Sequence, residues 1–97
     1  MRIEVKNIDG NPVNNLRRFG YSFQRQEGDE RSFIRPLAAA GYPRFHMYVK
    51  MDGADMMINI HLDMKKETYG ENTRHHGEYG DEGALKEEAR RLKVLLG

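Results

Sequence analysis

The sequence of 97 residues contains no cysteine, which excludes disulfide bonds and thiolate metal sites. It also lacks any apolar run close to the roughly 20 residues that a transmembrane helix needs, so we expect no membrane contact. The N-terminal segment Met-Arg-Ile-Glu-Val alternates between apolar and polar residues and lacks the apolar centre of a signal peptide. These absences predict a cytoplasmic protein, and the length predicts one domain.

The net charge is only +1, but the two signs are unevenly distributed along the chain. Residues 11–50 contain seven basic and three acidic side chains, whereas residues 67–88 contain seven acidic and two basic ones. Such a division is typical of an anion-binding face with an acidic counter-face, and also of complementary self-packing or a homodimer. We therefore expect RNA or another anionic ligand, or a second copy of the chain, as the partner.

Two stretches between Arg44 and Met64 alternate between apolar and polar residues, which is the pattern of half-buried strands. The segment Asp52-Gly53-Ala54-Asp55 joins them, and Asp-Gly is a strong signal for a β-hairpin. A one-residue slip between the strands would place apolar residues opposite polar ones. Only registers that preserve the two faces are therefore allowed.

Two such registers remain. In the first, which closes on Gly53-Ala54, His46 lies opposite His61. In the second, slipped by two residues, His46 lies opposite Asn59. Directly opposed residues have Cβ atoms roughly 5 Å apart and diagonal ones about 7 Å apart, so either register leaves His46, His61 and Asp63 within mutual reach.

We predict a single α+β domain over residues 1–97, in which a C-terminal helix packs on one face of an antiparallel sheet of three to four strands. The helix is expected over residues 82–96. Its apolar side chains recur at helical spacing, at Leu85, Ala89, Leu92 and Leu96. Residues 65–80 contain three glycines and almost no apolar side chains, which predicts a long polar loop. A short helix is expected from Pro12 to Phe19, with Asn11 as its N-cap.

The order of a short helix, antiparallel strands and a closing helix resembles the architecture of the double-stranded-RNA-binding domain. Two segments resemble the opening of the HicA-type messenger-RNA-cleaving toxins: Leu16-Arg17-Arg18-Phe19-Gly20-Tyr21 and Arg25-Gln26-Glu27-Gly28. Asp29 and Glu30 stand where those toxins have Ser-His, so the catalytic histidine of that family is missing here.

Most of the chain also resembles a family of small bacterial proteins, and this resemblance implies no activity. Four segments carry it: Ile34-Arg35-Pro36-Leu37, Tyr42-Pro43-Arg44-Phe45-His46, His61-Leu62-Asp63 and His76-Gly77-Glu78-Tyr79.

The candidate site consists of His46, His61 and Asp63. Two imidazoles and a carboxylate form a ligand set for zinc or for non-haem iron, so a divalent metal such as zinc is the candidate cofactor. His76, in the expected polar loop, is a further candidate ligand. The same three residues are candidate catalytic groups, because a histidine pair can act as general acid and base in RNA cleavage. Such residues are also typical of the solvated face of an antiparallel sheet.

A nucleic-acid surface needs basic side chains that bind phosphates and aromatic rings that stack on bases. The candidates for such a surface are Arg25, Arg35, Arg44, Tyr48 and Lys50, together with Tyr21. A third possibility is a protein-interaction module without chemistry, in which Met56, Met57 and an edge strand bind a partner.

Overall fold

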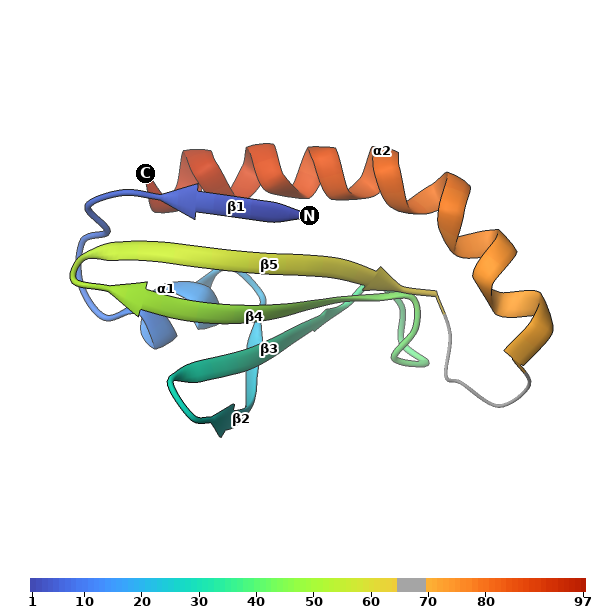
Figure 1. The fold of residues 1–97 in the computed structure, drawn as a ribbon, viewed down its shortest axis with the longest axis horizontal. Helices are drawn as coiled ribbons and strands as arrows, with labels where there is room; N and C mark the ends of the chain where they lie inside the picture. The colour runs from blue at the N-terminus through green and yellow to red at the C-terminus, as the bar shows by residue number, and fades with distance from the viewer. Residues whose placement is uncertain (65–69) are drawn as a thin grey trace.

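A computed structural model describes residues 1–64 and 70–97 of the protein, with side chains described for residues 1–64 and 83–97. The chain forms a sheet with a long helix along one face (Figure 1). The elements are β1 (Arg2–Val5), α1 (Pro12–Arg18), β2 (Ser22–Glu27), β3 (Glu30–Pro36), β4 (Arg44–Asp52), β5 (Asp55–Asp63) and α2 (Gly70–Leu96).

The predicted α+β class with an antiparallel sheet and a C-terminal helix is confirmed, but the strand count was too low. Within the described residues the sheet has five strands, in the order β1-β5-β4-β3-β2, and all neighbours are antiparallel. β1 pairs with the edge of β5 that β4 leaves free. It is a short strand of four residues, and the sequence alone does not show which neighbour such a strand pairs with.

The β4–β5 hairpin adopts the first of the two predicted registers. Met51 pairs with Met56, and His46 pairs with His61. The turn lies at Gly53, whose φ of 63° is a left-handed conformation that glycine adopts without steric cost. Because side chains alternate along a strand, this register fixes which residues share each face of the sheet.

The core lies on one face of the sheet, the inner face, which packs against α2. The strands fill it with buried side chains: Ile3, Val5, Phe33, Phe45, Met47, Val49, Met56, Ile58, Ile60 and Leu62. Leu85, Leu92 and Leu96 of α2 complete this core, and burial of each leucine contributes about 1.5–3 kcal/mol. The protein-interaction hypothesis required Met56 at the surface, but Met56 is buried in this core.

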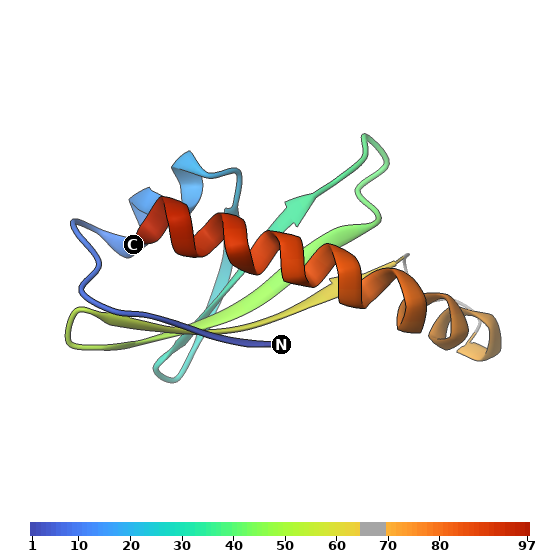
Figure 2. The same cartoon turned by 90° about the horizontal axis from the view of Figure 1, so that it is seen from above.

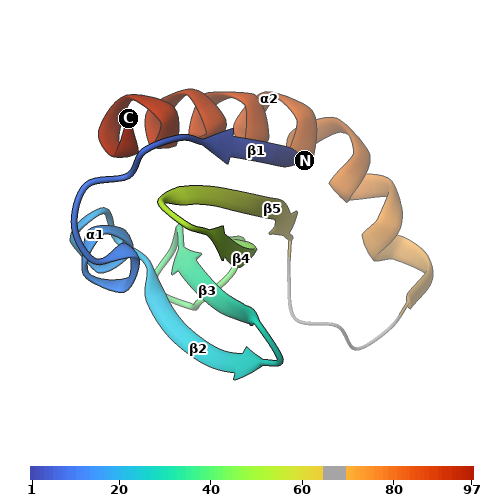
Figure 3. The same cartoon turned by 60° about the vertical axis from the view of Figure 1, so that its left-hand side comes forward.

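The two helices lie over different parts of the sheet. Seen from above, α2 crosses the sheet diagonally (Figure 2), and it contacts β5 and β1. The short α1 instead contacts β2 (Figure 3). Asn11 caps α1 as predicted, because its side chain accepts hydrogen bonds from the backbone N–H groups of Val13 and Asn14 at 2.8 and 3.1 Å.

Helix α2 begins at Gly70, twelve residues before the predicted start at Glu82. The prediction of a polar loop over residues 65–80 is thus wrong for residues 70–80, and residues 65–69 lie outside the described part of the chain. Glycines lower helix propensity by about 1 kcal/mol each, but only proline blocks a helix outright, and the sequence has no proline after Pro43. No helix in residues 1–64 and 70–97 has the length and apolar character needed to cross a membrane.

Candidate functional site

Three potential metal ligands lie together on the outer face of the sheet, opposite the core. His46 and His61 are directly paired, and their ring centroids are 4.8 Å apart. The carboxylate of Asp63 lies 3.7 Å from His46 Nδ1 and 3.3 Å from His61 Nε2. One ligand atom from each residue lies within 4.8 Å of the other two. Tetrahedral zinc with bonds of about 2.0–2.2 Å keeps its ligand atoms about 3.4 Å apart, so the side chains would have to close by up to about 1.4 Å to bind zinc.

The cluster is anchored on one side and accessible on the other. The side chain of His46 is 13% exposed, that of Asp63 is 29% exposed and that of His61 is 45% exposed. His46 is thus held by its neighbours, whereas His61 can adjust its rotamer. A bound ion would keep an open coordination position towards solvent, as ions do in catalytic rather than structural sites.

The surroundings of His46 favour its neutral form. Burial lowers the pKa of His46 below its usual value, and the neighbouring His61 lowers it further. The carboxylate of Asp63 raises the same pKa, but it does not outweigh the other effects. Neutral imidazole is the form that binds metal ions, so this electrostatic environment suits a ligand.

Arg44 lies beside His46 on β4, and both side chains approach the same oxygen of Asp63. Its Nε atom is 3.6 Å from Asp63 Oδ2, and its guanidinium stacks over the ring of Tyr42 at 4.5 Å from the centroid. Arg44 Nε and His46 Nε2 are both buried and have no hydrogen-bond partner among the described residues. Because buried polar atoms are usually paired, these two atoms mark the cluster as unlike an ordinary sheet surface.

The predicted nucleic-acid residues do not all share one surface. Register places Arg25, Arg44, Tyr48 and Lys50 on the outer face, together with the cluster. Arg35 is paired with Phe45 and therefore lies on the inner face, so its assignment to this surface is wrong. The alternation of β3 explains the error, because Phe33 and Arg35 are two residues apart and point the same way.

Two of the remaining basic candidates already have acidic neighbours. Arg25 is paired with Glu27 at 3.0 Å, and Lys50 is paired with Asp29 at 3.4 Å. All four side chains are more than half exposed, so these ion pairs add little to stability and leave both cations accessible. Tyr48 packs against His46, with ring centroids 4.9 Å apart.

A groove of about 680 Å³ lies on the outer face next to the cluster, and it contains residues that the sequence did not identify. Tyr48 forms one of its walls, and the groove is also lined by two basic residues, two acidic residues and an amide: Arg2, Lys50, Glu30, Asp52 and Asn59. Alternation already places Asn59 on the same face as His61. Arg2 joins the groove only because β1 pairs with β5, and it lies opposite Asn59 in that pairing.

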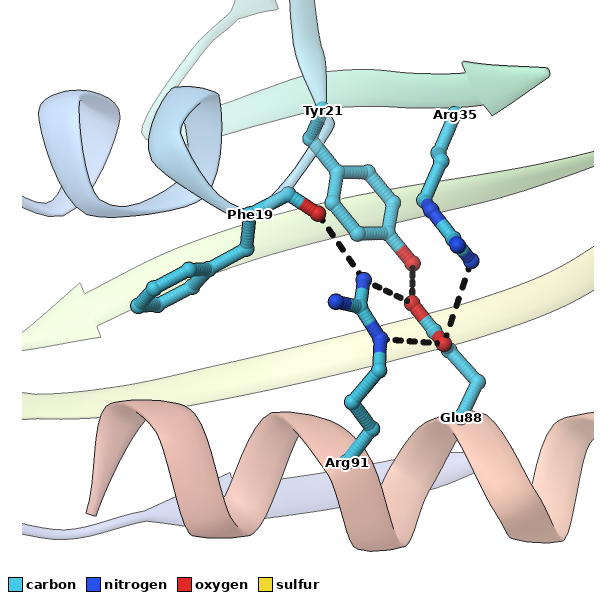
Figure 4. Close-up of polar contacts among 5 residues, drawn as sticks. All are labelled: Phe19, Tyr21, Arg35, Glu88 and Arg91. Carbon is cyan, nitrogen blue, oxygen red and sulfur yellow. Dashed lines mark hydrogen bonds and ion pairs between the residues drawn. The ribbon is translucent and has the colours of Figure 1, made fainter.

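A second polar cluster lies inside the protein, between the sheet and α2 (Figure 4). Glu88 is 4% exposed and accepts a hydrogen bond from the hydroxyl of Tyr21 at 2.6 Å. It also accepts hydrogen bonds from Arg91 at 2.9 and 3.0 Å and from Arg35 at 3.3 Å. Arg91 donates a further hydrogen bond to the backbone carbonyl of Phe19 at 2.9 Å.

This buried network explains why Tyr21 is not the exposed aromatic residue that the sequence suggested. Burial and the hydrogen bond to Glu88 raise the pKa of Tyr21, which remains a neutral donor. Burial alone would raise the pKa of Glu88, but hydrogen bonds from Arg91 and Tyr21 lower it overall. The sequence carried a signal for this network, because Glu88 falls on the apolar stripe between Leu85 and Leu92.

The remaining candidate ligand and the comparisons with known proteins add no further site residue. The side chain of His76 lies outside the described part of the structure. Searches against protein-family models, curated proteins and solved structures found no match to the chain. The candidate site therefore depends on its own geometry.

Proposed function

We propose that the protein binds a divalent transition-metal ion through His46, His61 and Asp63. The observation that carries this proposal is the convergence of three ligand atoms within 4.8 Å of one another on two paired strands. Two imidazoles and one carboxylate are a ligand set that zinc accepts, and zinc is the reference ion for the experiments below.

The strands pre-organise the site. His46 and His61 are held opposite each other by the backbone pairing of β4 and β5, and Asp63 follows two residues after His61 on the same face. The backbone of such a site does not have to fold around the ion, so little conformational entropy is lost on binding. Arg44 competes with the ion for the carboxylate of Asp63. The ion must therefore displace Arg44 or share the carboxylate with it.

Histidine NMR during zinc titration tests the proposal. We expect one equivalent of zinc to shift the ring signals of His46 and His61 together, because both imidazoles bind the same ion. The variant Asp63→Asn should weaken this response by at least tenfold, because it removes the only anionic ligand of the three described.

Asp52→Asn is the matched control. Asp52 is also a carboxylate of the β4–β5 hairpin, but it is exposed and lies at the turn, away from the cluster. This variant should bind zinc as the wild type does. Separate, independent responses of the two histidines, or an equal loss in both aspartate variants, would contradict the proposed site.

A further inference from the structure

The metal site and the groove on the outer face share a wall. The ring of Tyr48 lies between them, with its centroid 4.9 Å from that of His46 and 6.3 Å from that of His61. On its other side the same tyrosine lines the groove of about 680 Å³. His46, His61 and Asp63 do not line the groove, so a ligand bound at the open position of the metal would reach the groove by passing along the outer face over Tyr48.

The charge of the loaded site selects an anion. A divalent ion would bring two positive charges to a cluster whose only described negative group is Asp63, and Arg44 adds another positive charge 3.6 Å from that carboxylate. An imidazole that binds a metal ion is neutral, so the loaded site would carry a surplus positive charge. Phosphate suits it, because its oxygens bind both a divalent ion and the planar fork of an arginine.

The groove selects what is attached to the phosphate. Tyr48 offers an aromatic ring on which a base can stack, and Asn59 and Arg2 offer hydrogen-bonding groups to the edge of a base or to a sugar. Asn59 is two residues from His61 along β5, a distance of about 7 Å, which is comparable to the span from phosphate to base in a nucleotide. The groove volume also lies within the range of about 300–1,000 Å³ that is usual for small-molecule sites.

We infer that the loaded cluster binds the phosphate of a nucleotide, with the base against Tyr48. This inference rests on the proposed metal site, and it adds Tyr48, Arg44 and Asn59 as residues that bind the ligand. The phosphate source is either a free mononucleotide or an RNA strand, which present the same chemical groups to the site.

Titration of the zinc-loaded protein with adenosine 5′-monophosphate tests the inference. The zinc-shifted signals of His46 and His61 serve as an internal check, because they show that the nucleotide joins the ion rather than removing it. Binding should weaken at least tenfold when zinc is withheld. Tyr48→Leu should weaken binding of the nucleotide about tenfold, the usual effect of losing one stacked base, but should leave binding of inorganic phosphate unchanged.

Arg44→Gln should weaken the binding of both ligands, because Arg44 contacts the phosphate. Arg90→Gln is the matched control, because Arg90 is exposed on α2. We expect this variant to bind both ligands as the wild type does. Normal zinc shifts without any nucleotide binding, or nucleotide binding that ignores both zinc and Tyr48, would overturn the inference and leave the metal site standing. Failure of the histidines to respond to zinc would instead remove the metal site and the inference with it.

A parallel titration with hexaadenylate distinguishes the two phosphate sources. Zinc-dependent binding at least tenfold tighter than that of the mononucleotide would identify an RNA strand, because neighbouring phosphates then reach Lys50 and Arg2. Equal affinities would identify a mononucleotide. Both results support the shared chemistry.

Discussion

Replacing Glu88 with alanine should destabilise the protein by about 3 kcal/mol, because the substitution leaves buried donors without an acceptor. Breaking a buried ion pair generally costs about 3–5 kcal/mol. The lower value applies here, because the side chains of Arg35 and Arg91 are 29% and 34% exposed and can recover water as a partner. The hydroxyl of Tyr21 cannot, since Tyr21 is only 2% exposed.

The conservative variant Glu88→Gln separates charge from shape. It keeps an acceptor for Tyr21 and a similar volume, so we expect a loss of about half as much, on the order of 1.5 kcal/mol at pH 7. The pKa of Glu88 in the folded protein is lowered from its usual value of 4.5. The ionised carboxylate therefore stabilises the fold fully at pH values above the usual pKa of 4.5. This contribution is lost as the pH falls through the lowered pKa of Glu88 in the folded protein. The difference between wild type and Glu88→Gln should accordingly shrink below about pH 4.

Urea unfolding followed by circular dichroism measures these differences at each pH. Glu87→Gln is the control, because Glu87 is the neighbouring residue on α2 and is exposed, and we expect a change within about 0.5 kcal/mol. If Glu88→Ala unfolds at the same urea concentration as Glu87→Gln, the buried network around Glu88 does not stabilise the fold.

Two further substitutions test the assignment of faces and turns. Ile60→Asp should lower the free energy of unfolding by about 4 kcal/mol or more, because Ile60 is fully buried and the new charge has no partner. Asn59→Asp, on the exposed face, should change it little. Equal thermal midpoints for the two variants would show that the faces of β5 are assigned the wrong way round. Gly20→Ala should cost about 1–3 kcal/mol, because φ at Gly20 is 103° and a Cβ there would lie 3.2 Å from Arg35 Nε; an unchanged unfolding midpoint would contradict that backbone conformation.

The hairpin and its cluster were predictable because strand alternation and an Asp-Gly turn are local signals. These signals place His46, His61 and Asp63 on one face of the hairpin in either predicted register. The pairing of His46 with His61 in the structure shows that the first register is the correct one. Nothing local could place Arg2 beside Asn59, because that neighbourhood arises from the pairing of β1 with β5, more than fifty residues apart in the sequence.

The errors in the predicted surface have a related origin. Arg35 was grouped with the outer basic residues by charge, although its position two residues after Phe33 places it on the inner face. There it is tolerated because Glu88 of α2 supplies a negative partner. Glu88 was itself treated as part of an acidic block, since composition does not show that a charged residue lies on an apolar stripe. Arg35 and Glu88 both occupy core-facing positions, and a buried charge needs a partner of opposite sign. Such positions therefore predict an internal ion pair rather than an exposed binding surface.

The most direct test of the metal site is an X-ray diffraction measurement at the zinc absorption edge, on crystals of the protein grown with one equivalent of zinc. We expect an anomalous peak on the outer face, within about 2.2 Å of one atom each of His46, His61 and Asp63. An anomalous peak elsewhere on the chain, or ordered side chains at the cluster with no anomalous peak between them, would contradict the proposed metal site.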